Sequence, residues 1–215
     1  MVQGKIRLVF KKDGKLKFIS HLDLIRTMKG AFSRAEIPIY YSEGFNPHPK
    51  MVFSLPLSIG CESVCEYLDI KLNSPMDEKE LLERLNAQFP PELKFTDVYE
   101  RTTEFTSIAS AEYVITLYEN VTAQDVNKAL EGPVIVTKKS KKGMIDVDLK
   151  NGIHSILVAQ EDGAVKIKAT LGAKQDGYVN PDLLIKGIGT KLGMEFWDYD
   201  IIRTAVYSDS GKLFR

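Results

Sequence analysis

The chain has 215 residues and carries 29 Lys and Arg against 29 Asp and Glu, so its formal net charge is zero. This balance excludes a histone-like basic protein and an acidic tail protein, and a hydrophobic content of 44% is typical of one large or two compact globular domains. No stretch approaches the roughly 18 apolar residues of a membrane span, and the first residues lack the apolar core of a signal peptide, so we expect a cytoplasmic protein.

The first hundred residues predict a strand, a helix, two strands, a helix and a strand, in that order. Alternating apolar and basic side chains at 5–11 indicate a strand with one solvated face. Ser20 is a good helix cap, and Pro75 opens the second helix. The predicted elements are strand 5–11, helix 20–35, strands 51–57 and 66–72, helix 74–89 and strand 93–99. This βαββαβ order is that of a ferredoxin-like unit.

The second half predicts a similar order with one additional hairpin. Its elements are strand 113–118, helix 122–130, strands 134–137, 145–149, 155–159 and 165–171, helix 180–188 and strand 196–206. The basic run 138–143 is predicted to be a solvated hairpin tip. We therefore predict an α+β protein of two tandem ferredoxin-like units with antiparallel sheets. The units span 1–100 and 112–215, the second with the extra hairpin, and the Thr- and Ser-rich residues 101–111 link them.

The segment 40–50 is the densest functional candidate. Two prolines flank His48 and favour a stiff, extended backbone, and aromatic side chains stand near Lys50. Aromatic rings beside a cation suit base stacking and phosphate contact in single-stranded RNA. A rigid connector whose aromatic side chains pack under the sheet is an equally compatible interpretation.

His21 follows the predicted cap at a helix N-terminus, a position that attracts anions. It could contact a phosphate or transfer a proton, together with Arg26 and Lys29 on the polar side of the same helix. For a single histidine we favour the simpler interpretation of a surface or capping residue.

Cys61 and Cys65 are the two cysteines of the chain. Together with His21 and His48 they would offer four side chains able to bind zinc. Zinc sites of this type usually rest on C-x2-C pairs, however, and these cysteines are four residues apart. We therefore predict buried, inert thiols, and neither a metal nor a cofactor.

Two sequence strings carry a resemblance to a known family. I-S-H-L-D-L at 19–24 and G-F-N-P-H-P at 44–49 occur together, and shorter matching segments lie at 35–38, 56–57 and 66–70. The first half thereby resembles the bacterial radical SAM-linked family, a domain of unknown function that occurs alone or attached to the C-terminal end of a B12-type radical SAM enzyme. The second half fits this family in layout. The resemblance implies a companion radical SAM protein and an RNA-linked setting, without an established reaction.

The predicted tandem architecture, with a glycine-rich segment at 187–193, is also similar to that of CRISPR repeat-RNA endonucleases. In those enzymes a histidine acts as general acid or base on a ribose 2′-hydroxyl. By this similarity His21 or His48 would be catalytic, and Lys50 or Arg26 would steady the phosphate.

The charge is distributed unevenly along the chain. Residues 1–50 contain 10 basic and 4 acidic side chains, a net of +6, whereas residues 51–100 contain 4 and 10, a net of −6. We expect an accessory module without catalytic activity of its own that binds ribosomal or transfer RNA for a radical SAM enzyme. A metal-independent endoribonuclease and a protein–protein adaptor without RNA contact are the alternatives. The expected RNA-binding residues are Arg26, Lys29, Tyr40, Tyr41, Phe45, Asn46, His48 and Lys50.

Overall fold

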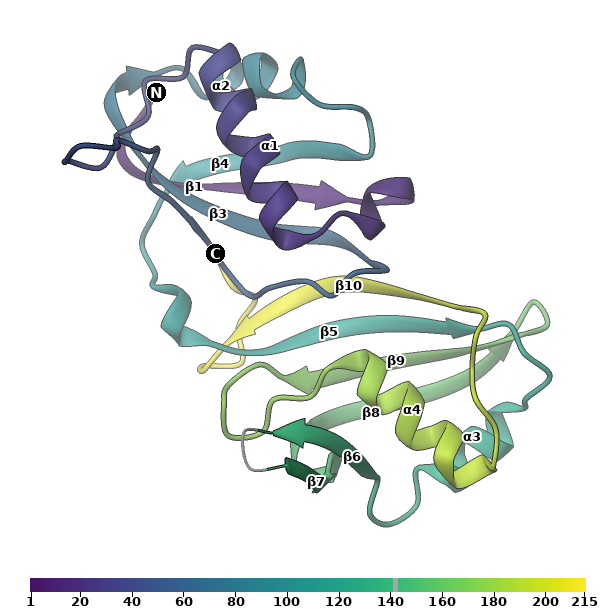
Figure 1. The fold of residues 1–215 in the computed structure, drawn as a ribbon. Helices are drawn as coiled ribbons and strands as arrows, with labels where there is room; N and C mark the ends of the chain where they lie inside the picture. Colours follow the sequence, from purple (N-terminus) through teal and green to yellow (C-terminus); the bar gives the residue numbers. More distant parts are fainter. Residues whose placement is uncertain (141–142) are drawn as a thin grey trace. The chain divides into compact units, whose positions relative to one another are not determined.

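The computed structural model describes residues 1–140 and 143–215, which form a mixed α+β protein with antiparallel sheets (Figure 1). The chain divides into two compact units. Unit 1 comprises residues 1–107 together with Arg215, and unit 2 comprises residues 108–214. In the part of the chain that the structure describes, every helix is too short or too polar to cross a membrane.

Unit 1 consists of an antiparallel sheet with two helices on one face (Figure 1). Its strands lie in the order β4-β1-β3, and the short β2 pairs with β3. The elements are β1 (Val2–Lys12), a 3-10 helix (Gly14–Phe18), α1 (His21–Arg34), β2 (Met51–Phe53), β3 (Cys61–Met76), α2 (Glu78–Asn86) and β4 (Leu93–Glu100).

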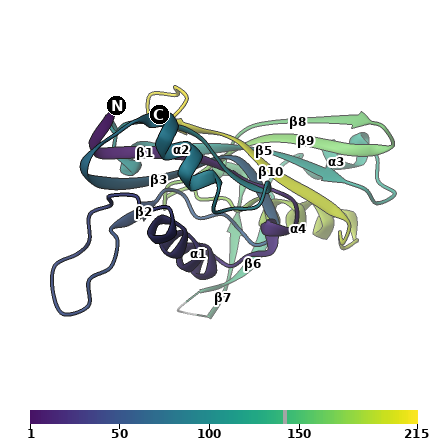
Figure 2. The same cartoon turned by 90° about the horizontal axis from the view of Figure 1, so that it is seen from above.

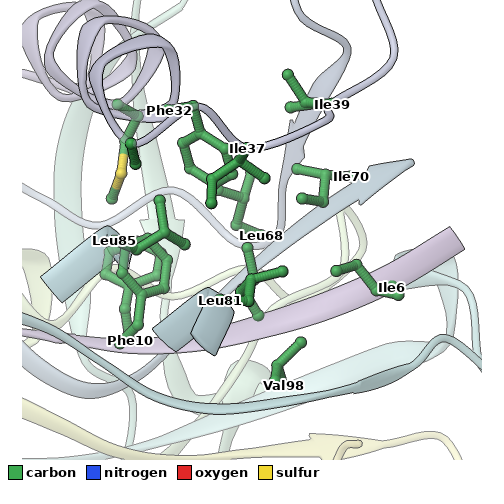
Figure 3. Close-up of a cluster of buried hydrophobic side chains, with 14 of the residues drawn as sticks. Ile6, Phe10, Phe32, Ile37, Ile39, Leu68, Ile70, Leu81, Leu85 and Val98 are labelled. Atoms are coloured by element: carbon green, nitrogen blue, oxygen red, sulfur yellow. The ribbon is translucent and has the colours of Figure 1, made fainter. Parts of the chain in front are cut away.

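The core of unit 1 lies between the sheet and the two helices. Alternate residues of β1, among them Ile6 and Phe10, point toward the helices, where Phe32 of α1 and Leu81 of α2 pack against them (Figure 3). All four of these side chains are almost completely buried. The intervening residues of β1 therefore point to the opposite face of the sheet, which the helices leave uncovered.

Each α-helix of unit 1 begins directly after a residue whose side chain caps it. Ser20 caps α1 as predicted, its Oγ accepting a hydrogen bond from the backbone N–H of Asp23 at 3.1 Å. The predicted start of the second helix at 74–75 is wrong, because the chain remains extended to Met76, which pairs with Val2. Asp77 caps α2 instead.

The two middle strands also differ from their predicted lengths. The strand predicted over 51–57 ends at Phe53, and residues 54–60 lead to β3 without regular structure of their own. The strand predicted over 66–72 instead runs from Cys61 to Met76, because it pairs with β1 along almost its whole length. Pairing with a long neighbour thus overrides the local propensity of the residues at both ends.

Unit 2 has a four-stranded antiparallel sheet in the order β10-β5-β9-β8. Strands β6 and β7 form a separate two-stranded sheet, the additional hairpin that the sequence predicts. The tip predicted over 138–143 is too long, because Lys138 and Lys139 belong to β6 and pair with Ile145 and Met144. The remaining tip falls on residues 141–142, which lie outside the described residues. The elements are β5 (Ile108–Leu117), α3 (Ala123–Ala129), β6 (Ile135–Ser140), β7 (Gly143–Asp148), β8 (Ile153–Glu161), β9 (Ala164–Gly172), α4 (Pro181–Leu192) and β10 (Tyr199–Ser208).

Several boundaries in unit 2 differ from the prediction, among them the following three. Residues 108–111, assigned to the linker, belong to β5, where the small residues Ser110 and Ala111 are buried in the sheet. Helix α4 continues past 188 to Leu192 and ends at Gly193, whose φ of 68° is the left-handed cap conformation that glycine adopts easily. The last strand begins at Tyr199 rather than at 196.

Three glycines of unit 2 pack so closely that two of them leave no room for a Cβ atom. A Cβ atom added to Gly172 would lie 2.3 Å from the carbonyl oxygen of Gly177, and one added to Gly152 would lie 2.2 Å from the same oxygen. Gly172→Ala should therefore lower the free energy of unfolding by roughly 1–3 kcal/mol, measured by urea denaturation. As a control, Gly30→Ala in α1 meets only the flexible end of Arg34 and should leave stability equal or higher. Unchanged stability of Gly172→Ala would contradict this packing.

Candidate nucleic-acid interface

A shallow cleft of about 340 Å³ lies on unit 1. We call it the Tyr40 groove, and its polar lining consists of Lys5, Tyr40, Lys50, Asp69, Lys71 and Arg101. Four of these side chains are cations and one is an aromatic ring. In such a cluster the cations can contact phosphate groups while the aromatic ring stacks on a base.

Strand register explains why the cations meet. Lys5 alternates with the core residue Ile6, so its side chain points to the face of the sheet that the helices leave uncovered. Lys71 of β3 is paired directly with Lys5 across the two antiparallel strands. Like charges directly opposite each other on one face of a sheet destabilise the pairing, so folding alone does not favour this arrangement.

Tyr40 is held at the edge of the same face. Its backbone N–H donates to the carbonyl of Lys71 at 2.8 Å, and its own carbonyl accepts from the N–H of Lys50 at 3.0 Å. The ammonium groups of Lys71 and Lys50 lie 4.5 Å and 5.3 Å from the centre of the Tyr40 ring. The carboxylate of Glu43 beside the hydroxyl raises the pKa of Tyr40, so the phenol stays neutral.

The acidic residue in the groove does not neutralise the lysines. Asp69 accepts two hydrogen bonds from Arg7, at 2.7 Å and 2.9 Å, and Arg7 is completely buried. Arg101 lies 3.5 Å from the same carboxylate. Among the described residues, none of the three lysines of the groove forms an ion pair with a carboxylate. The groove therefore keeps a surplus of positive charge.

Residues 40–50 form a short two-stranded arm, which extends away from α1 and β2 (Figure 2). Tyr41 is bridged to Pro49, and the N–H of Ser42 donates to the carbonyl of His48 at 2.8 Å. The Ser42 hydroxyl lies 3.0 Å from Nδ1 of His48 and also accepts from the His48 N–H. Phe45, at the tip, is fully exposed. The interpretation that the aromatic side chains all pack under the sheet is thus wrong for Phe45, because the arm projects into solvent.

The candidate residues on α1 lie apart from the groove. His21 contacts Phe53 edge-on, with the ring centres 5.4 Å apart. Arg26 donates to Asp23 at 2.9 Å, and the pKa of that carboxyl is lowered mainly by the Ser20 hydroxyl and then by Arg26. None of His21, Arg26 and Lys29 lines the groove. The structure therefore divides the predicted RNA-binding residues between α1 and the arm.

The two cysteines lie in β3, and both are buried and outside any disulfide; their burial was predicted. In the described part of the chain, no three His, Cys, Asp or Glu side chains come together in a way that could hold a metal ion.

The sequence alone did not identify three cations of the groove. Lys5, Lys71 and Arg101 come from separate segments, and only the pairing of the strands brings them together in the Tyr40 groove. The one available signal was the alternation of residues 5–11, which places Lys5 on the solvated face of its strand.

Comparison with known proteins gives one family and a distant structural likeness. The model of a family described as "Uncharacterized protein conserved in bacteria (DUF2344)" matches residues 5–181. No curated protein matches the sequence. A chain in the crystal structure of a Cbf5-Nop10-Gar1 complex is 15% identical with a TM-score of 0.50, a likeness of fold alone; the match covers 94% of this chain and about half, 48%, of that chain. An unknown protein from Galdieria sulphuraria is 10% identical over 94% of this chain and 98% of its own, with a TM-score of 0.27.

Proposed function

The chain belongs to this uncharacterized family conserved in bacteria (DUF2344), and we propose that it is an accessory module that binds RNA for a radical SAM enzyme. Unit 1 holds single-stranded RNA, from ribosomal or transfer RNA, in the Tyr40 groove, and the chain has no catalytic activity of its own. The observation that carries this proposal is the pairing of Lys5 with Lys71 on the uncovered face of the sheet, beside the Tyr40 ring.

A bound polyanion would offset the repulsion between the lysines of the groove. Lys5 and Lys71 repel each other in the free protein, and a phosphate between them would be attracted by both. The ring of Tyr40 supplies a flat surface on which an unpaired base can stack. Base stacking next to phosphate contacts is the usual way in which proteins hold single-stranded RNA, and one face of a sheet is a common site for it.

The partner enzyme is proposed from the two sequence strings. One string forms the start of α1, and the other forms most of the tip of the arm, so both lie in unit 1. The order of elements in each unit also supports our proposal that both are ferredoxin-like modules. Crosslinking in cells followed by mass spectrometry should recover a radical SAM enzyme bound to this chain. Crosslinks to other proteins alone would refute the partnership.

The RNA-binding part of the proposal is tested by the salt dependence of binding. A fluorescently labelled single-stranded 12-mer RNA should bind the purified protein, with an anisotropy increase that weakens as KCl is raised. Three or four phosphate contacts predict a slope of log K against log[salt] of roughly −2 to −3. Absence of binding at 50 mM salt would refute the proposal.

A variant of α1 tells the two candidate surfaces apart. Arg26→Gln with Lys29→Gln removes two charges of the helix and none of the groove, so the affinity for the 12-mer should stay within about twofold of the wild type. Loss of binding in this variant would move the RNA site from the groove to α1.

A further inference from the structure

We infer that the arm, residues 40–50, extends the Tyr40 groove into a track for a single strand of RNA. In this track one base stacks on Tyr40, a second base stacks on Phe45, and His48 donates a hydrogen bond to the RNA backbone between them. The inference rests on the proposed function and specifies its ligand as an unpaired segment of more than one nucleotide.

The pairing within the arm places its polar side chains on the face of the groove. Tyr40 is paired with Lys50, Tyr41 with Pro49, and Ser42 with His48. Side chains alternate between the two faces of such a ribbon, so the first and third pairs share a face and the second pair lies on the other. Since Tyr40 and Lys50 line the groove, Ser42 and His48 continue its surface, whereas Pro49 is buried on the opposite side.

The contacts of His48 prepare it to donate a hydrogen bond. The Ser42 oxygen accepts from the backbone N–H of His48 at 3.1 Å, so its own proton can point to Nδ1, 3.0 Å away. The carbonyl of Asn46 lies farther from Nδ1, at 3.4 Å. Both contacts engage Nδ1, so Nε2 is the ring nitrogen left for the ligand. The inferred contact to RNA uses the tautomer in which Nδ1 accepts from Ser42 and Nε2–H donates.

The spacing of the arm requires a ligand longer than one nucleotide. Consecutive side chains on one face of a strand are about 7 Å apart, so the Ser42–His48 pair lies one such step beyond Tyr40. Phe45 lies farther still, at the tip. A single nucleotide that stacks on Tyr40 therefore does not reach Phe45, whereas a strand of several nucleotides does. A duplex is excluded because its bases are already stacked on one another.

Hydrogen bonds hold the two sides of the arm together in the free protein. Two of them join backbone groups across the Tyr41–Pro49 bridge, and the Ser42 hydroxyl adds contacts to His48, so binding orders few additional residues. Phe45 nevertheless keeps its whole ring in water, with 111% of its reference area exposed. A rigid support with an exposed ring at its end is suited to stacking.

The test compares two exposed phenylalanines of unit 1. Phe45→Ala should weaken binding of the single-stranded 12-mer roughly 5- to 150-fold, which is the range for loss of one stacked base. Phe18→Ala, which removes another exposed ring at the end of the 3-10 helix, should leave the affinity unchanged. Circular dichroism checks that both variants are folded.

A length series and a substitution of His48 complete the test. Phe45→Ala should not change the affinity for a uridine monophosphate but should weaken binding of a hexamer, and a duplex should bind less tightly than the single strand. His48→Gln, which keeps an N–H donor, should bind the 12-mer more tightly than His48→Ala.

The outcomes separate the two proposals. If the 12-mer binds the wild type and the Phe45 variant equally, the track is wrong while the groove remains as the RNA site. If the wild type binds no RNA, both proposals fail. If Phe45→Ala removes only crosslinks to a protein partner and leaves RNA affinity intact, the arm is a protein-binding element and the track is likewise overturned.

Discussion

Replacing Arg7 with Met should lower the free energy of unfolding by about 3–5 kcal/mol, because it leaves the buried Asp69 carboxylate without its main partner. The guanidinium also donates to the hydroxyl and the carbonyl of Thr103, each at 2.8 Å, and lies 4.3 Å from the centre of the Phe105 ring. The variant therefore also loses the contacts that hold residues 103–105 against β1. Urea denaturation followed by circular dichroism measures the effect.

A partly exposed ion pair at the end of the same strand provides the control. Lys11 and Asp13 form a contact of 2.7 Å, but both side chains are about one-third exposed. Lys11→Met should therefore cost no more than about 1 kcal/mol. The double variant Arg7→Met with Asp69→Leu, which removes both charges of this buried pair, should recover part of the loss. Equal stability of Arg7→Met and Lys11→Met would show that the buried pair does not support unit 1.

Reversing two charges in the groove should have the largest effect on RNA affinity. Lys50→Glu with Lys71→Glu removes two cations beside the Tyr40 ring and adds two anions. Loss of two contacts to a single strand corresponds to roughly 50-fold weaker binding at 50 mM salt, and reversal adds repulsion to this. The slope of log K against log[salt] should become shallower by about 1.4. Fluorescence anisotropy with the labelled 12-mer gives both values.

The matched control changes the net charge by the same amount elsewhere in unit 1. Lys15 and Lys79 are exposed, on the 3-10 helix and on α2, and neither lines the groove. Lys15→Glu with Lys79→Glu should weaken binding only slightly. If both double variants weaken binding equally, overall charge rather than the groove determines the affinity.

Local patterns were sufficient for most elements and for part of the candidate site. The strand at 5–11 and the cap at Ser20 depend on neighbouring residues only, and both appear in the structure. The solvated face predicted for this strand is wrong at Arg7, which is completely buried because it pairs with Asp69. Tyr40 and Lys50 were found together because one short segment contains them. Each of these features depends on residues that are close together in the sequence, and sequence patterns indicate only such local relations.

Features that depend on distant residues could not be predicted in this way. Met76 remains in β3 because it pairs with Val2, which is more than 70 residues earlier in the sequence. The meeting of Lys5 and Lys71 requires the register of two strands whose residues are far apart in the chain. Helix α1 carries Arg26 and Lys29 on the side of the sheet that faces away from these lysines, which the count of charges in residues 1–50 could not show.

The pairing of Lys5 with Lys71 also sets selection for stability against selection for RNA binding. Either lysine could be exchanged for threonine, which suits a strand and removes the repulsion, so such a change should make unit 1 more resistant to heat. A library of variants that is sorted only for thermal tolerance should accordingly lose one of the two lysines, whereas sorting for RNA capture should retain both. The stability that unit 1 loses through this pair would then indicate that its surface was selected for binding a ligand.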